Sequence, residues 1–367
     1  MFTDPSFALR LTRLGVALCA ASLVVPSNAR AQNSERIAFS GKNIAIYNLV
    51  GQLRVTGGNS SAVARVTRRG RDASRLTLGT GTVDGFEALR VVYPSDRITL
   101  ADSRGRRTRT EMRVRDDGTF GNRYETGRAS NRFNEGRRVR IGDEGGGLEA
   151  AADIELQIPN GVTVRLHVAF GDVTVTNVRG DIAVDVSGGA VHSTDTQGTL
   201  TIDTGSGDAT ITNASGMLSL DTGSGDVIAR NISGAGLLID SGSGNVTLEG
   251  CSSTKIRIDT GSGNLRASGM TTRSLSMDTG SGDVVLGLLN SPDTITIDSG
   301  SGDVTLHLPA NFSATLNIDT GSGGITSDFP VQMTSKVRDT MIGRIGNGEG
   351  RLVIETGSGS VRLRKVN

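Results

Sequence analysis

The chain of 367 residues contains no tryptophan, and only 3% of its residues are aromatic. Globular cores usually draw much of their buried apolar area from aromatic side chains. Between Gly180 and Thr320, Phe312 is the only Phe, Tyr or Trp. A thick, conventional core is therefore excluded for this stretch, and a thin interior filled by aliphatic side chains is expected.

Cysteine is almost absent as well, since Cys19 and Cys251 are the only two. Cys19 lies in a segment typical of a secretory signal, in which basic residues precede a short apolar run and an Ala-x-Ala site ends at Ala31. We expect residues 1–31 to be removed, which leaves Cys251 alone and excludes an internal disulfide. A thiol tucked at a turn is the simplest interpretation of Cys251. An intermolecular bond and a reactive thiol are the alternatives.

Long apolar runs are also missing. The run at residues 14–25 is shorter than the roughly 20 residues that span a bilayer, and no later run is longer. We expect the mature chain, which begins near Gln32, to be exported and to have no transmembrane segment. Periplasm, outer cell surface and secretion all remain open as destinations.

The formal net charge is only +1, but the charge is unevenly distributed. Residues 36–144 hold 22 Lys/Arg and 12 Asp/Glu, a balance of +10, whereas residues 179–320 hold 6 and 16, a balance of −10. Such asymmetry between a basic and an acidic half is informative where the net charge is not. Nucleic acid is not expected as a partner, because the chain is exported and lacks aromatic residues for base stacking.

Glycine is abundant, with 51 residues, many of them in a repeated Asp-Thr/Ser-Gly-Ser-Gly element. Successive Asp copies are 18 to 21 residues apart, and the longer interval between Asp319 and Glu355 has room for two repeats, one of them degenerate. Two degenerate copies of the element precede Asp203 at the same 18-residue interval, one beginning at Asp185 and the other at His167. The acids that open the copies are Asp185, Asp203, Asp221, Asp240, Asp259, Asp278, Asp298, Asp319 and Glu355.

Each repeat carries two short segments in which apolar residues alternate with polar ones, such as Leu200-x-Ile202 and Ala209-x-Ile211. Period-2 alternation bounded by Gly, Ser, Asn and Asp predicts half-buried strands joined by tight turns. Two strands and two turns form one coil, which buries its apolar side chains only by stacking on its neighbours. The sequence predicts an all-β fold, a β-solenoid of stacked two-strand rungs of 18–21 residues over residues 148–367.

The N-terminal half is less regular. Alternating segments within residues 32–100 predict an irregular β cap or first rungs that protect the open end of the solenoid. Residues 101–147 contain 12 Arg and little periodicity, so we expect a loop or disordered insertion. Two alternatives for this insertion are folding back onto the acidic repeats and binding a polyanion such as acidic polysaccharide or lipid headgroups.

At this point a family resemblance becomes specific. The segments Val91-Val-Tyr-Pro94, Ala152-Asp-Ile-Glu-Leu-Gln-Ile-Pro159 and Phe170-Gly-Asp-Val-Thr-Val175, followed by Asp-Thr-Gly-Ser-Gly-Asp repeats, resemble the bacterial toast-rack family of exported β-strand-repeat proteins, which also carries an adhesin label. The resemblance covers most of the mature chain and implies an exported β-solenoid without known catalytic residues. The family pattern does not explain the Arg-rich insertion.

Asp-Thr-Gly-Ser is also the signature of aspartic proteases, which need one pair of carboxylates sharing a proton in a cleft. Here the tetrapeptide recurs once per repeat, so proteolysis is rejected. The acid five positions later becomes Asn245, Asn264 or Gly324 in other repeats, which indicates a structural role in capping the turn. The first acid never becomes Asn, although a turn would accept it.

A column of retained acids has three interpretations: a structural role, cation binding, or contact with a basic partner surface. Calcium is the cation considered, but one carboxylate per repeat supplies fewer than its usual six to eight oxygens. No other cofactor is expected, and the three His residues lack metal-ligand spacing. We expect a non-enzymatic, adhesin-like binding or structural element of the cell envelope, with polysaccharide or another envelope protein as partner. The alternatives are a carbohydrate-active β-helix enzyme and a calcium-binding repeat protein.

Overall fold

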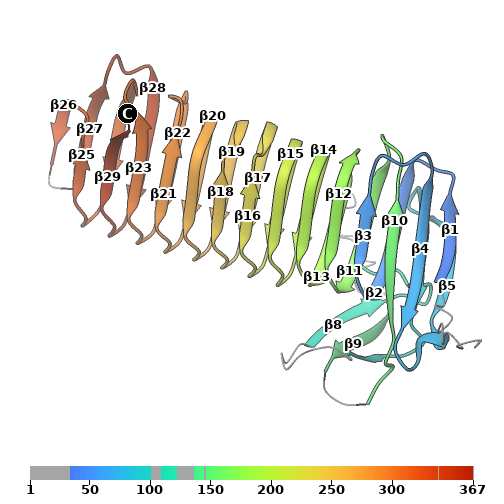
Figure 1. Ribbon diagram of the computed structural model, residues 1–367. Helices are drawn as coiled ribbons and strands as arrows, with labels where there is room; N and C mark the ends of the chain where they lie inside the picture. Colours follow the sequence, from blue (N-terminus) through green and yellow to red (C-terminus); the bar gives the residue numbers. More distant parts are fainter. Residues whose placement is uncertain (1–33, 101–108, 122–135, 144–145, 338, 367) are drawn as a thin grey trace, which may run out of the picture. The chain divides into compact units, whose positions relative to one another are not determined.

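Alternation of apolar and polar residues produces strands along almost the whole chain (Figure 1). The computed structural model describes residues 34–100, 109–121, 136–143, 146–337 and 339–366, which belong to one compact unit, Asn33–Asn367. Among them, the only helical element is a 3-10 turn, η1 (Ala73–Arg75). The prediction of an all-β chain is confirmed. The expected signal segment, residues 1–31, lies outside the described residues.

The strands form two long ladders, and the strands β14, β15 and β20 run through both of them. The first ladder consists, in spatial order, of β5 (Thr77–Val83), β6 (Phe86–Val92), β2 (Asn43–Val50), β11 (Thr163–Phe170), β13 (Ile182–Gly188), β14 (Val191–Thr204), β15 (Ala209–Thr222), β17 (Ser233–Ser241), β19 (Ser252–Thr260), β20 (Leu265–Thr279), β22 (Thr294–Ser299), β28 (Gly350–Thr356), β24 (Ala314–Asp319), β27 (Thr340–Ile345) and β26 (Gln332–Lys336).

The second ladder follows the other strand of each repeat. It consists of β1 (Ser34–Phe39), β4 (Ala62–Arg69), β10 (Ala151–Gln157), β3 (Leu53–Thr56), β12 (Val173–Arg179), β14, β15, β16 (Val227–Arg230), β18 (Val246–Glu249), β20, β21 (Val284–Leu288), β23 (Val304–Pro309), β29 (Val361–Val366) and β25 (Ile325–Ser327). From β3 to β25 every pairing in this ladder is parallel.

Successive repeats pair in register, so equivalent residues lie side by side. Leu200 pairs with Leu218, which pairs with Leu237, and each of the three is at most 3% exposed. Burying one such aliphatic side chain stabilises the fold by about 1.5–3 kcal/mol. The interior is a line of stacked aliphatic side chains, and this explains how the repeats manage without aromatic residues.

The C-terminal end departs from sequence order. Strand β28 of the last repeat pairs with β22 on one side and with β24 on the other, so it lies between two repeats that precede it in the chain. The interval before Glu355 holds no degenerate parallel repeat, and that prediction was wrong. Its residues form β26 and β27, which pair in antiparallel fashion and cover the last strand of the stack, β24. Covering the edge of a sheet in this way limits pairing with other chains.

The Arg-rich insertion is not merely a loop. Its described residues include β8 (Arg109–Val114) and β9 (Arg137–Gly142), which form a small sheet with β7 (Arg97–Thr99). The expectation of a loop or disordered insertion was wrong for these strands, because Val114, Val139 and Ile141 alternate with the arginines and are buried. Residues 101–108, 122–135 and 144–145 of the insertion lie outside the described part.

Candidate functional site

The acids that open the repeats form one column on the first ladder. Asp203 pairs with Asp185 on one side and with Asp221 on the other, and the same register holds to the end of the stack. Their order in space is Asp185, Asp203, Asp221, Asp240, Asp259, Asp278, Asp298, Glu355 and Asp319. We call these nine residues the acidic column. Neighbouring strands in a sheet are about 4.8 Å apart, so every carboxylate between the two ends of the column, Asp185 and Asp319, has like charges on both sides.

Two acids of the acidic column, Asp240 and Asp278, have a raised pKa. Partial desolvation raises the pKa of Asp240, and the carboxylates of Asp221 and Asp259 on the flanking strands raise it further. The pKa of Asp278 is raised in the same way, by desolvation first and then by its two neighbours in the column. Arg257 opposes both shifts, and its guanidinium lies 3.7 Å from Asp259. The column therefore concentrates negative charge that the fold only partly compensates.

An aromatic cluster lies at the N-terminal end of the acidic column. The position equivalent to the acid is His167 in β11 and Tyr47 in β2, and their rings stack at 4.5 Å with an interplanar angle of 5°. His167 Nδ1 lies 3.3 Å from Asp185 Oδ2, and Phe120 packs edge-on against both rings. A Cβ on Gly121 would lie 2.8 Å from Asp185 Oδ2. Two residues of the Arg-rich insertion therefore contact this end of the column.

The second acid of the repeat has a different role. Asp208 Oδ1 accepts a hydrogen bond of 2.9 Å from the backbone N–H of Asp226, and Asp226 Oδ1 accepts one of 2.8 Å from Asn245. The amide oxygens of Asn245 and Asn264 accept the same bond from the next repeat. The structural role is thus present, but the predicted cap of its own turn is wrong. The side chain joins neighbouring repeats. Asn can replace Asp at this position because an amide oxygen accepts the hydrogen bond as a carboxylate oxygen does.

The turn itself is fixed by the hydroxyl residue of the Asp-Thr-Gly-Ser-Gly element. Thr204 Oγ1 is buried and accepts a hydrogen bond of 3.2 Å from the N–H of Gly207. The equivalent bond recurs at Ser241 and Thr260, with the glycine three residues later as donor. A Cβ on Gly207 would lie 1.6 Å from the carbonyl oxygen of Gly189 in the neighbouring repeat, so only glycine fits. The protease-like signature is therefore turn chemistry.

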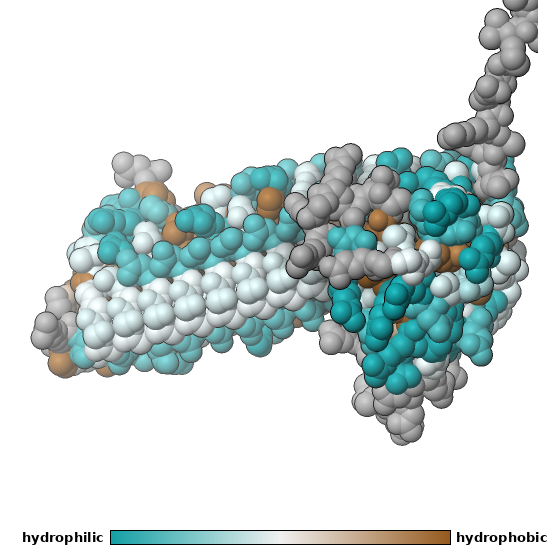
Figure 2. All heavy atoms as spheres, turned by 90° about the horizontal axis from the view of Figure 1, so that it is seen from below, coloured by the Kyte–Doolittle hydropathy of each residue, from teal (hydrophilic) through white to brown (hydrophobic). Residues whose placement is uncertain are grey.

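These turns form a surface of their own. Gly205 and Ser206 are exposed, as are the equivalent Gly223 and Ser224 in the next repeat. Figure 2 shows a pale band of intermediate hydropathy along the repeats, with hydrophilic rows beside it. The band agrees with stacked Gly-Ser turns. It presents small side chains without a hollow that could hold a substrate.

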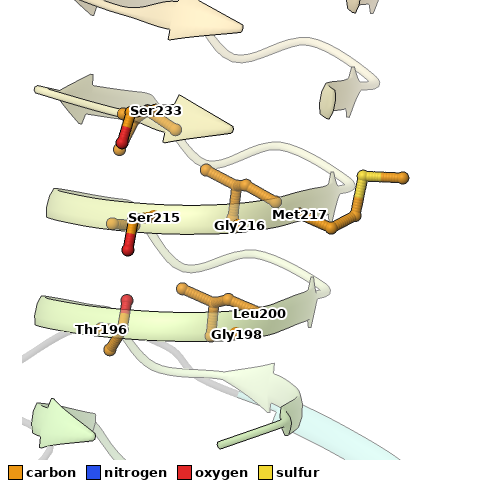
Figure 3. Close-up of a pocket in the computed structure, with 10 residues that line it drawn as sticks. Thr196, Gly198, Leu200, Ser215, Gly216, Met217 and Ser233 are labelled. Carbon is orange, nitrogen blue, oxygen red and sulfur yellow. The ribbon is translucent and has the colours of Figure 1, made fainter. Parts of the chain in front are cut away.

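A small cavity lies where the repeat length changes from 18 to 19 residues. The register shifts between Gly216 and Met217, opposite Gly234 and Gly236. The cavity has a volume of about 10 Å³, enough for one water molecule, and Figure 3 shows Thr196, Ser215 and Ser233 on successive strands beside it. Met217 extends away from them (Figure 3). A bound water would satisfy the buried hydroxyl of Thr196, which has no hydrogen-bond partner among the described residues.

The remaining candidate residues do not assemble into a reactive site. Cys251 is fully buried, and burial raises the pKa of its thiol, which favours the unreactive form. His192 and His307 lie on the second ladder, away from His167 on the first. Among the described residues, no group of three His, Cys, Asp or Glu side chains is placed to hold a metal ion. Within the same residues, no helix is long and apolar enough to cross a membrane.

The in-register ladders and the repeated turns define an all-β repeat protein. Residues 194–364 match the family model described as Toastrack DUF4097, and this repeat region belongs to that family. The resemblance inferred from the sequence is confirmed. No enzyme family is indicated, and no curated protein matches the chain.

Three solved structures are similar to the chain, each over 91% of its length. A provisionally named adhesin from Parabacteroides distasonis is 10% identical, is covered over 96% of its own chain and gives a TM-score of 0.42. A provisionally named cell adhesion protein from Clostridium sporogenes is 10% identical, with 99% coverage and a TM-score of 0.19. A provisionally named lipid binding protein from Parabacteroides distasonis is 12% identical, with 96% coverage and a TM-score of 0.40.

Proposed function

We propose that the protein is exported and non-enzymatic, and that its stacked repeats form a β-solenoid serving as an adhesin-like binding or structural element of the cell envelope. The acidic column carries this proposal. It places like charges at even intervals along a line, whereas a catalytic site brings unlike groups together around one reacting atom. A repetitive line of charge suits contact with an extended partner.

The partner best matched to the acidic column presents basic groups along a line, as an envelope protein or a polysaccharide with amino groups would. The triple variant Asp221→Asn, Asp240→Asn, Asp259→Asn removes three adjacent charges from the column. A matched control, Asp208→Asn with Asp226→Asn and Asp283→Asn, removes three charges from the second acid position while keeping the oxygen that joins the repeats. Purified protein should bind cells that lack it, the triple variant should lose most of this binding, and the control should not. Equal binding by all three proteins would contradict the proposal.

Export is tested separately, by fractionation of tagged cells and protease shaving of intact ones. We expect the tag in the envelope or in the medium. Recovery of the full-length chain in the cytoplasm would contradict export and leave the fold unaffected. If the exported protein still carried residues 1–31, only the prediction that this segment is cleaved would be contradicted.

A carbohydrate-active enzyme is the alternative. Glycoside hydrolysis commonly uses two carboxyl groups with different pKa values on opposite sides of one bond. The acids of the column lie instead in one line on one face, and the pKa values of Asp240 and Asp278 move in the same direction. Incubation with envelope and extracellular polysaccharides should release no product above background. Product that disappears in the triple variant would support the enzyme.

Calcium binding by the column makes a different prediction. A specific site would stabilise the fold by an amount that rises with the logarithm of the calcium concentration above its dissociation constant. We expect the same melting temperature in excess calcium, in excess magnesium and with a chelator at matched ionic strength. A rise in calcium alone would support the calcium-binding alternative.

A further inference from the structure

The small sheet formed by β7, β9 and β8 has one buried and one exposed face. Ile98, Val114, Val139 and Ile141 point to the buried side, each at most 1% exposed. The residues between them point to solvent. Six exposed side chains make up this surface, which we call the basic face: Arg97, Arg109, Glu111, Arg113, Arg138 and Arg140.

The pairing of the strands draws these charges together. Arg140 lies opposite Arg97 in β7 and opposite Glu111 in β8, and Arg138 lies opposite Arg113. Like charges directly opposite each other destabilise a sheet. Their placement on three short strands does not stabilise the sheet, so we expect the charge to have a use outside the fold.

Among the described residues, Glu111 is the one carboxylate that forms ion pairs with the basic face. Glu111 accepts a hydrogen bond of 2.9 Å from Arg140 and pairs with Arg138 at 3.1 Å. The hydrogen bond from Arg140 is the main cause of the lowered pKa of Glu111, and the charges of Arg138, Arg140 and Arg109 add to it. Five guanidinium groups against one carboxylate leave an excess of four positive charges.

Two of the arginines have no ionic partner in the described part of the chain. No ion pair or hydrogen bond joins the guanidinium group of Arg97 or Arg109 to the described residues, and both side chains are exposed. Ser95 contacts Arg97 only through the Arg97 backbone. Arg113 donates to the backbone oxygen of Gly136 at 3.0 Å, which fixes its position without neutralising it. The basic face therefore presents guanidinium groups that the sheet holds in place and that are available to bind an anion.

The spacing of the arginines on the sheet favours the binding of phosphate groups that lie in one plane. Guanidinium binds phosphate through two parallel hydrogen bonds and loses less water than an ammonium group on doing so. Neighbouring strands place the arginines about 4.8 Å apart, and alternate residues of one strand are about 6.8 Å apart. No aromatic ring lies among the six residues, so the stacking platform that commonly helps to bind sugars is missing.

We propose that the basic face docks the protein onto a membrane surface that contains anionic phospholipids. The phosphates of the headgroups are the ligands, and the arginines bind them without inserting into the bilayer. This inference extends the proposed function, since it gives the basic half of the chain a lipid surface as partner. It does not depend on the charge of the acidic column, because β7, β9 and β8 form a separate sheet that includes none of the strands of the column.

The test is sedimentation of the purified full chain with vesicles of phosphatidylcholine alone or with about 30% phosphatidylglycerol. The variant Arg97→Gln with Arg109→Gln removes two charges that have no ionic partner in the described structure. The control Arg266→Gln with Arg351→Gln removes two exposed charges from the repeats. All proteins share residues 1–31, so any difference between them reports the arginines and not that apolar segment.

We expect binding only to vesicles with phosphatidylglycerol, weakened about 25-fold in the first variant at about fivefold per arginine, and unchanged in the control. Raising the salt from about 0.1 M to about 0.5 M should release the wild-type protein, which gives a measure independent of any variant. Equal binding by the first variant, binding that resists salt, or equal binding to neutral vesicles would overturn the proposal. Binding to an acidic polysaccharide such as heparin but not to the vesicles would also overturn it, in favour of a polysaccharide.

Discussion

Asp298 pairs in register with Glu355, the acid of the last repeat in the sequence, and not with Asp319, the acid of the next one. Glu355 then pairs with Asp319 on its other side. The final repeat is inserted into the stack, where it gains two parallel neighbours. Its place ties the end of the chain into the ladder and leaves β24 to be covered by the antiparallel strand β27.

This insertion makes the last repeat important for stability. Ile354 is fully buried between Ile297 and Ile318 of the flanking strands. Replacing it by Ala should lower the free energy of unfolding by about 2–5 kcal/mol, because a cavity opens in a tightly packed interior. Denaturant unfolding followed by circular dichroism measures the change. Val353→Ala, on the outer face of the same strand, is the control and should cost under about 1 kcal/mol.

The acidic column should destabilise the fold at neutral pH. The pKa values of Asp240 and Asp278 are raised in the folded state, so these acids stabilise the fold when protonated, and that stability is lost as pH rises past the ordinary aspartate value of 3.8. Asp240→Asn should therefore raise the melting temperature at pH 7, by removing a repulsion of about 1 kcal/mol per neighbour at water's dielectric. Below the ordinary value, the variant and the wild type should melt together.

The control for this prediction is Asp226→Asn, which removes the same charge from the second acid position and keeps its hydrogen bond to Asn245. It should raise the melting temperature less than Asp240→Asn does. A lower melting temperature for Asp240→Asn at pH 7 would show that the charge itself stabilises the fold.

The turn hydroxyl offers a test of the role assigned to the repeated motif. Thr260 Oγ1 is buried and accepts the N–H of Gly263 at 3.2 Å. Thr260→Val keeps the shape but leaves that N–H without a partner, which should cost about 1–3 kcal/mol. Thr260→Ser should cost less, since Ser241 and Ser299 make the same bond in other repeats. Thermal melts of the two variants compare them directly, and equal melting temperatures would contradict the assigned role.

The second glycine of the motif should tolerate no side chain. A Cβ on Gly263 would lie 1.9 Å from the carbonyl oxygen of Gly244 in the neighbouring repeat. Gly263→Ala should therefore separate two repeats and cost about 3 kcal/mol or more, at the upper end of what overpacking costs. Gly324→Ala is the matched control, since no atom lies within 4 Å of its Cβ position. Similar stability of the two variants, measured by denaturant unfolding, would contradict the close stacking.

Much of this fold could be predicted from spacing alone. The 18-residue step from Asp185 to Asp203 gives the register of the column, and the alternation around Leu200 gives the buried face. The position of Glu355 could not be predicted, because the repeats are chemically alike and any of them could pair with any other. Strands β8 and β9 were missed because their exposed arginines hide the alternation of Val139 and Ile141.

The second acid position shows a further limit to what could be predicted from the sequence. Exchange of Asp208 for Asn in other repeats indicates an accepting oxygen, but not the donor that it serves. The donor is the backbone of the next repeat, which becomes visible only when the two strands lie side by side. The position of His167 in the aromatic cluster could be predicted from the sequence, because His167 lies 18 residues, or one repeat, before Asp185. Its partners Tyr47 and Phe120 come from distant segments.

In-register stacking, with the last repeat inserted before Asp319, is the relationship on which the acidic column depends. Cysteine pairs test it directly, since Thr296 pairs with Val353 and Val353 pairs with Asn317 on the outer face of the ladder. Adjacent strands bring the Cα atoms within the roughly 7 Å that a disulfide allows, whereas strands two apart are about 9.6 Å distant. Mass spectrometry after mild oxidation should find a disulfide in Thr296→Cys with Val353→Cys and none in Thr296→Cys with Asn317→Cys. The opposite result would show that the repeats stack in sequence order and would contradict the column described above.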